Sequence, residues 1–199
     1  MTRISKPEYK LLEESIWYLN LEEMRTFCQT HDLPMYIHVE RADGRLRRTP
    51  DRDRKDIVLQ RIRDFALRGE RSGPTVYVPA VVGQAPLPTR ITARTRIHYG
   101  QYEKKNAHFV ATLQRLTGGE FRLGMIARLV LRDFWTDGVA PTMRQFAEAW
   151  MKATAEHKEP RPEGAYLSDL HKGLGRKGWK ALRVEKARKA ITILDKLVS

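Results

Sequence analysis

Residues 19–68 decide how this chain folds: LNLEEMRTFCQTHDLPMYIHVERADGRLRRTPDRDRKDIVLQRIRDFALR. Two segments of this stretch repeat apolar residues at helical spacing. In the first segment, residues 20–31, these are Leu21, Met24, Phe27 and Cys28. In the second, which starts at residue 54, they are Ile57, Val58, Ile62, Phe65 and Ala66. Both patterns predict amphipathic helices of about three turns each, which would pair through their apolar stripes as a small helical hairpin.

A basic insert separates the two predicted helices. Its residues 36–49 contain short extended runs on either side of Asp43-Gly44, a dipeptide typical of a tight β-hairpin turn. The arginines that would project from this ribbon are Arg41, Arg45, Arg47 and Arg48. Two interpretations stay open: the ribbon reaches DNA phosphates as a wing does, or it is a solvated loop whose arginines pair with nearby aspartates.

The second helix has a recognisable start and a basic edge. Thr49-Pro50-Asp51 combines a capping hydroxyl, a proline at the first helical position and an acid near the positive helix end. Arg54, Arg61 and Arg68 recur every seven residues, so they would line one edge of this helix. Phosphate contact and plain solvation are both compatible with that row.

The helical pair resembles the SAP domain, a helix-extended loop-helix module of DNA-associated proteins. The resemblance depends in the first half on Leu21, Met24, Phe27, Cys28, Leu33 and Pro34, and in the second on Arg54, Lys55, Ile57, Val58, Arg61, Ile62 and Phe65. It implies binding to duplex DNA with little sequence preference. The family joins its helices by a few residues that include a Gly-Lys pair, whereas residues 35–50 intervene here.

The chain divides into four predicted parts. Residues 1–73 would form the SAP-like domain, with a lead-in helix from Glu8 to Tyr18 and a capping box formed by Asn20 and Glu23. Residues 74–90 are rich in proline and predict an extended linker with a short edge strand. Residues 91–158 predict a helical domain, and residues 159–199 a basic extension.

The helical domain at 91–158 has two glycine-bounded helices and a third that opens at Pro141-Thr142. Four aromatic residues predict a core cluster: Phe134, Trp135, Phe146 and Trp150. The segment resembles a domain of unknown function that follows SAP-like segments in bacterial proteins. The residues that match it are Thr92, Thr95, Ile97, Tyr99, Phe109, Gly119, Phe121, Arg132, Asp133, Phe134, Ala147 and Trp150. This resemblance implies an architecture and no chemistry.

The basic extension has two features. Its first part mixes three glycines and Trp179 with cations that could lie against a phosphate backbone: Lys172, Arg176, Lys177 and Lys180. Its second part, from Arg183 to Val198, predicts an amphipathic helix. That helix would either dock on the helical domain or self-associate through Val184, Ala187, Ile191 and Leu194.

Composition favours a polyanionic partner. The 199 residues are 41% hydrophobic and 31% charged, and the formal net charge is +13. The excess is +2 in residues 1–73, +6 in 74–158 and +5 in 159–199, so the later parts carry most of it. Without an apolar run of membrane-spanning length or an apolar signal segment, the sequence predicts a cytoplasmic protein, associated with the nucleoid if it binds DNA.

Nothing in the sequence predicts catalysis, a cofactor or a metal site. The six histidines do not form a metal-binding pair with a flanking acid, and the single cysteine, Cys28, falls on an apolar helix face. The glycines at 173, 175 and 178 lack the Gly-Lys-Ser/Thr ending of a phosphate-binding loop. We therefore expect a binding protein and not an enzyme.

The leading hypothesis is a mainly α, bacterial or phage-related accessory protein that binds duplex DNA through phosphate contacts. The predicted contact residues are Arg41, Arg45, Arg47, Arg48, Arg52, Arg54, Lys55, Arg61, Lys172, Arg176, Lys177 and Lys180. RNA binding remains open, because composition does not separate the two nucleic acids. The alternative from another class is a protein-interaction adaptor or a homo-oligomer in which the charge serves solubility.

Overall fold

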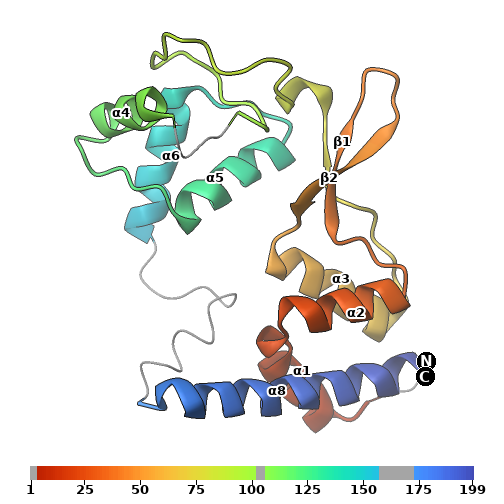
Figure 1. Cartoon of the computed structure of the whole chain (residues 1–199). Helices are drawn as coiled ribbons and strands as arrows, with labels where there is room; N and C mark the ends of the chain where they lie inside the picture. Colours follow the sequence, from red (N-terminus) through yellow and green to blue (C-terminus); the bar gives the residue numbers. More distant parts are fainter. Residues whose placement is uncertain (1–3, 102–105, 157–172) are drawn as a thin grey trace. The chain divides into compact units, whose positions relative to one another are not determined.

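The computed structural model describes residues 4–101, 106–156 and 173–199, and these are mainly helical (Figure 1). They form two compact units. Within the described ranges, unit 1 takes residues 4–36, 51–74 and 173–199, and unit 2 takes residues 37–50, 75–101 and 106–156. The predicted fold class, mainly α with a β-hairpin and a C-terminal helix, is confirmed. No helix in the described ranges has both the length and the apolar character that crossing a membrane requires.

The first two helices of unit 1 begin at capping boxes that can be recognised in the sequence. Helix α1 (Lys6–Ser15) begins with a capping box in which the Ser5 backbone N–H donates to Glu8 Oε2 at 2.8 Å, and a single 3₁₀ turn, η1 (Ile16–Tyr18), follows it. Helix α2 (Leu21–Thr30) begins the same way. The Glu23 N–H donates to Asn20 Oδ1 at 2.9 Å, and the Asn20 N–H donates to Glu23 Oε2 at 2.7 Å. Reciprocal bonds of this kind satisfy N–H groups that have no partner inside the helix.

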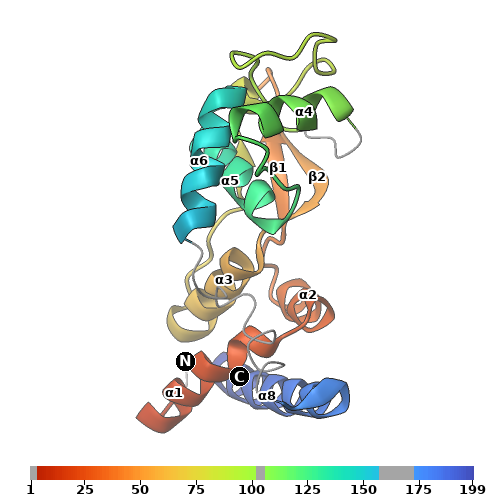
Figure 2. The same ribbon diagram turned by 90° about the vertical axis from the view of Figure 1, so that its left-hand side faces the viewer.

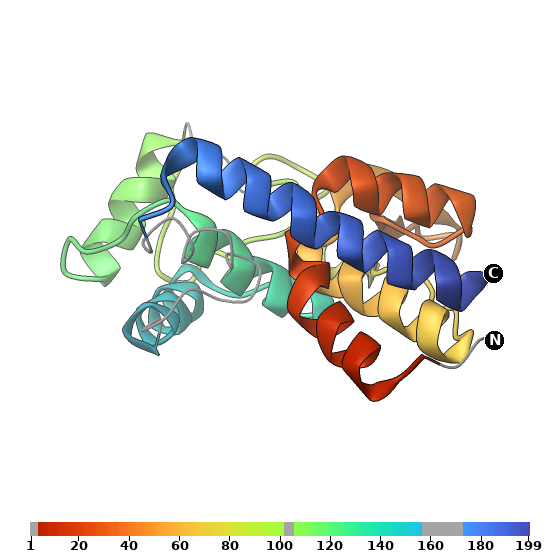
Figure 3. The same ribbon diagram turned by 90° about the horizontal axis from the view of Figure 1, so that it is seen from below.

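Two further helices complete unit 1. Helix α3 (Lys55–Arg68) ends at Gly69, whose φ of 70° is the left-handed conformation that glycine adopts without strain. Helix α8 (Gly175–Val198) runs along α1, as Figure 3 shows. The core that these helices share includes Leu12, Ile16, Met24, Phe27, Cys28, Val58, Leu59, Ile62, Ala187, Ala190, Ile193 and Leu194. The predicted pairing of the two amphipathic segments through their apolar stripes is therefore present.

A small sheet supplies one part of unit 2. The strands β1 (Tyr36–Glu40) and β2 (Leu46–Arg52) form the predicted hairpin, and β3 (Val76–Tyr77) adds to the other side of β1 in parallel, with His38 opposite Val76. Ile37 and Val39 of β1 are almost fully buried in the core of unit 2. The hairpin is thus anchored by the apolar face of its first strand.

Helices supply the rest of unit 2. After a 3₁₀ turn, η2 (Pro79–Val81), come α4 (Ala107–Leu116), α5 (Met125–Thr136) and α6 (Met143–Glu156), whose grouping is visible in Figure 2. The Trp135 indole N–H donates to the Ile97 carbonyl at 3.1 Å. At the predicted helix start, the Thr142 N–H donates to Gln145 Oε1 at 2.9 Å, and the Gln145 N–H donates to the Thr142 hydroxyl. Trp135, Phe146 and Trp150 are buried and Phe134 packs against them, so the predicted aromatic cluster belongs to the core.

The units divide the chain differently from the predicted domains. The hairpin, assigned to the first domain, lies largely in unit 2, because Ile37 and Val39 are buried there. Residues 75–90, predicted to be a linker, also belong to unit 2, where Tyr77 and Val81 are buried. Helix α8 belongs to unit 1 and packs in its core, which is neither of the two alternatives that the sequence left open, docking on the helical domain or self-association.

The predicted start of the second helix is also wrong. Residues 49–51 lie in β2, and α3 begins only at Lys55, with Arg54 at its N-cap and no side-chain cap. The Thr49 hydroxyl, which was expected to cap the helix, donates to the Ile37 carbonyl of β1 at 2.9 Å. Pairing within the sheet therefore prevails over the local helix-start signal.

Candidate nucleic-acid interface

The tip of the β1–β2 hairpin is a tight turn that brings arginines together. Gly44 has a φ of 75°, and its N–H donates to the Arg41 carbonyl at 2.9 Å. The Arg41 N–H donates to the Arg45 carbonyl at 2.9 Å, and the Arg45 N–H donates to Asp43 Oδ1 at 3.0 Å. The Asp43-Gly44 pair thus fixes the backbone of the turn, and the arginines flank this turn in the sequence.

All four hairpin arginines are exposed: Arg41, Arg45, Arg47 and Arg48. The nearest acid to Arg45 is Asp43, at 3.9 Å, and the Arg45 side chain is still 84% exposed. Within the described ranges neither Arg41 nor Arg47 forms an ion pair. Exposed guanidinium groups on a fixed ribbon can reach phosphate oxygens with little desolvation. We name these four residues the hairpin arginines.

The predicted contacts at the end of β2 and the start of α3 are engaged inside unit 1. Arg52 is half-buried, with its guanidinium carbon 5.9 Å from the centre of the Tyr36 ring. Arg54 is paired with Asp56 at 3.3 Å. The Lys55 ammonium donates to the Trp17 carbonyl. These cations already serve the local structure, which lowers the charge available to a ligand.

Arg61 requires a correction. Its side chain is 6% exposed, and its Nη1 donates to Asp53 Oδ2 at 2.6 Å and to the Pro34 carbonyl at 3.0 Å. A guanidinium buried against a carboxylate is not available to a phosphate. Arg61 instead links α3 to the segment that precedes β1.

The arginine row predicted along α3 is therefore neutralised. Arg54 and Arg61 have the partners just described, and Arg68 pairs with Asp64 and with Glu70, the latter at 3.0 Å. Hydrogen bonds from Arg68 to these acids also raise its pKa. These ion pairs do not favour phosphate contact by the row. They fit better with the other interpretation, in which the row is an ordinary part of the protein surface.

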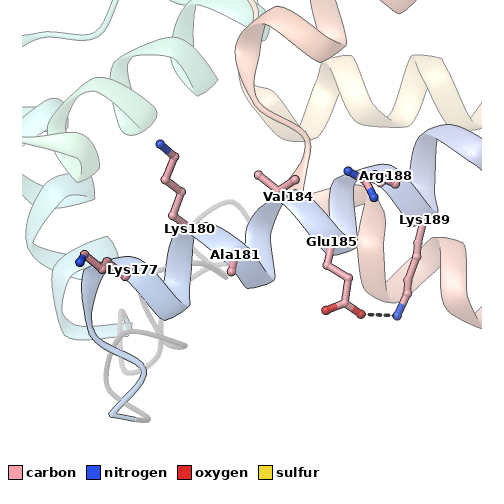
Figure 4. A pocket seen from close by; sticks show the side chains of 7 residues that line it. All are labelled: Lys177, Lys180, Ala181, Val184, Glu185, Arg188 and Lys189. Atoms are coloured by element: carbon pink, nitrogen blue, oxygen red, sulfur yellow. Dashed lines mark hydrogen bonds and ion pairs between the residues drawn. The ribbon is translucent and has the colours of Figure 1, made fainter.

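Helix α8 presents a second set of exposed cations, on unit 1. The helix begins at Gly175 and not at Arg183 as predicted, so the basic stretch is part of it. A surface hollow of about 720 Å³ has described lining residues that all come from this helix. Figure 4 shows their side chains: Lys177, Lys180, Ala181, Val184, Glu185, Arg188 and Lys189. Because one helix supplies them all, the hollow is a shallow groove between side chains.

The exposed cations of α8 differ in their pairing. Lys189 bonds to Glu185 at 2.5 Å, which lowers the pKa of Glu185. By contrast, Arg176, Lys177, Lys180 and Arg188 are exposed and have no ion pair within the described part of the chain. We name these four residues the α8 cations. Arg188 was not predicted from the sequence, although the spacing of residues 177, 180, 184 and 188 would have placed it on the same helical face.

The other predictions for the C-terminal extension have mixed outcomes. Lys172 lies outside the described residues. Trp179, predicted to be able to stack on a nucleic acid, is half-buried, and its ring lies 5.9 Å from that of Tyr18. Ala187 and Leu194 are buried in the core of unit 1 and Ile191 packs against it. The face expected to mediate self-association is therefore largely covered by the chain itself.

The described residues contain no group of three acidic, histidine or cysteine side chains that could hold a metal ion. Cys28 is 1% exposed, and burial raises the pKa of its thiol to about 11. A buried thiol that stays protonated at neutral pH is a poor nucleophile. Cys28 thus acts as a small core residue, as its position on the apolar face predicted.

No family model, curated protein or solved structure matches this chain.

Proposed function

We propose that this protein binds duplex nucleic acid, most readily DNA, by neutralising backbone phosphates with the hairpin arginines and the α8 cations. The observation that carries the proposal is the hairpin. It places four exposed arginines around one fixed turn, and among the described residues the nearest acid to Arg45 is 3.9 Å away. A rigid, strongly basic ribbon suits contact with a polyanion better than contact with a neutral protein surface.

Three further features support this proposal. The net charge of +13 favours polyanionic ligands. The paired amphipathic helices α2 and α3 agree with the resemblance to SAP domains, from which DNA binding is inferred. The α8 cations form a second exposed basic set with no acid partner in the described ranges. None of these features supplies contacts to base edges, so the expected binding has little sequence preference.

The experiment compares two triple variants with the same loss of charge. In the first, Arg41, Arg45 and Arg47 are replaced by alanine. In the control, Arg25, Arg54 and Arg68 are replaced, because each is paired with an acid. Duplex affinity is measured at low salt by fluorescence anisotropy, and circular dichroism checks that both variants are folded.

We expect the hairpin variant to bind at least tenfold more weakly to every duplex tested, and the control to bind within about threefold of the wild type. If both variants lost the same affinity, net charge alone would govern binding and the hairpin would have no special part. If neither changed, the hairpin arginines would not contact the nucleic acid.

A further inference from the structure

A second concave site lies in unit 2, between residues 89–91 and helix α4. It is a hollow of about 410 Å³, within the size range of small-molecule sites, and its lining includes Thr89, Arg90, Ile91, His108, Thr112 and Arg115. We name it the α4 hollow. None of its residues was among the predicted contacts.

The described charged residues that line the α4 hollow are all basic. Arg90, His108 and Arg115 are exposed, and none has an ion pair or a hydrogen bond from its side chain within the described ranges. No acidic residue is among the lining residues that the structure describes. His108, Thr112 and Arg115 follow one another at i, i+4 and i+7, so they share one face of α4. The hollow therefore gathers hydrogen-bond donors and positive charge.

Thr112 supplies a hydroxyl that a ligand in this hollow could bind. It is 6% exposed, and its hydroxyl has no hydrogen-bond partner among the described residues. The other buried threonines are satisfied: the Thr117 hydroxyl donates to the Leu113 carbonyl at 2.9 Å, and the Thr49 hydroxyl donates to the Ile37 carbonyl. Thr112 lines the hollow, so its hydroxyl can bond to water or to a polar group of a ligand.

We propose that the α4 hollow binds the phosphate of a phosphomonoester. A terminal phosphate has three unesterified oxygens, which can accept hydrogen bonds from two guanidinium groups and a hydroxyl at the same time. An internal phosphodiester of a duplex has two such oxygens and is flanked by sugars on both sides, so it suits a concave site less well. The phosphomonoester bound in the hollow would belong either to a free small molecule, such as a nucleotide, or to the 5′-end of a nucleic acid strand.

This proposal does not rest on the hairpin arginines or the α8 cations, so the two proposals can fail separately. Calorimetric titration of the full chain with adenosine 5′-monophosphate, and with adenosine as the matched control, tests the phosphate site directly. Duplexes with a 5′-phosphate or a 5′-hydroxyl test the other source. Tighter binding of the phosphorylated member of either pair supports the site, and the pair that shows it identifies the source. Equal binding within both pairs would overturn the proposal.

Two variants locate the binding. Arg115→Ala should weaken binding of the phosphorylated probe at least tenfold, because a charged hydrogen bond is lost. Thr112→Val keeps the shape and removes the hydroxyl, so it should weaken binding about threefold to tenfold while the unliganded chain unfolds at the same or a higher temperature. Arg128→Ala is the control, since Arg128 is exposed on α5 and does not line the hollow. Phosphate binding unaffected by both hollow variants would place the ligand elsewhere and refute the assignment.

Discussion

At the scale of single residues, acidic neighbours decide which arginines can meet a ligand. Arg47 and Arg61 both belong to the basic stretch at 41–61, and both were predicted to contact phosphate. Arg47 is exposed on the hairpin, whereas Arg61 is buried against Asp53. The local sequence does not reveal which of the two is buried. Asp53 comes close to Arg61 only because β2 ends and α3 begins on either side of residue 53, and the sequence did not predict these boundaries.

The buried pair gives the first prediction. Asp53→Asn should destabilise unit 1 by about 3–5 kcal/mol, because it leaves the Arg61 charge buried without its counter-charge. Urea denaturation followed by circular dichroism measures the change. Glu22→Gln is the control: it removes the partner of Arg25 in an exposed pair, and the unfolding midpoint should hardly move. A small effect of Asp53→Asn would mean that the pair contributes little to the fold.

At the scale of elements, local capping signals predicted helix starts well, except at Thr49-Pro50-Asp51, which lies in β2. The capping box at Asn20 and the helix start at Pro141-Thr142 are both present. Contacts between elements far apart in the sequence were not predicted, although the short edge strand expected in residues 74–90 is present as β3. Strand β3 pairs with β1 across more than thirty residues, and this pairing buries Tyr77 in a segment that its prolines marked as a linker. The part that α8 plays in the core of unit 1 likewise depends on α1, at the other end of the chain.

The second prediction tests whether α8 is a core element of unit 1. Leu194 is fully buried, whereas Val184, on the same helix, is 38% exposed. Leu194→Ala should lower the free energy of unfolding by about 2–5 kcal/mol through lost burial and a residual cavity. Val184→Ala should have a much smaller effect. Equal effects in a chemical denaturation experiment would show that α8 is not packed as described.

The third prediction concerns the ion pair between α1 and α8. The Lys196 ammonium donates to Glu8 Oε1 at 2.6 Å, and this bond, helped by the Ser5 backbone N–H, lowers the pKa of Glu8 from 4.5 to about 2. A carboxyl group with a lowered folded-state pKa contributes stability that is complete above pH 4.5 and is lost as the pH falls towards 2.

The test is the unfolding midpoint as a function of pH. Glu8→Gln should unfold more readily than the wild type at pH 7, and the two should converge as the pH approaches 2. A difference between them that stays constant from pH 7 to pH 2 would show that Glu8 does not titrate in this way.

At the scale of the whole molecule, the net charge favours a polyanionic ligand but does not identify which cations stay exposed. The described chain satisfies many of its cations internally, above all on α3, and leaves others exposed on the β1–β2 hairpin and on α8. Each set belongs to its own unit. Because phosphate binding is additive over separate cations, both sets can contribute to affinity.

The fourth prediction follows from this additivity. Each phosphate that is neutralised releases condensed counterions, so the affinity for a duplex falls with salt in proportion to the number of contacts. Replacing Arg41, Arg45 and Arg47 by alanine should make the slope of log affinity against log salt shallower by about 2.7, at about 0.9 for each phosphate contact. The variant of Arg25, Arg54 and Arg68 should keep the wild-type slope.

The most direct measurement is a salt titration of wild-type binding to a duplex of random sequence. With about 5–8 phosphates neutralised, the slope of log affinity against log salt should lie at about −4 to −7. An affinity that does not change with salt, or no detectable binding at low salt, would contradict phosphate-based recognition by this protein.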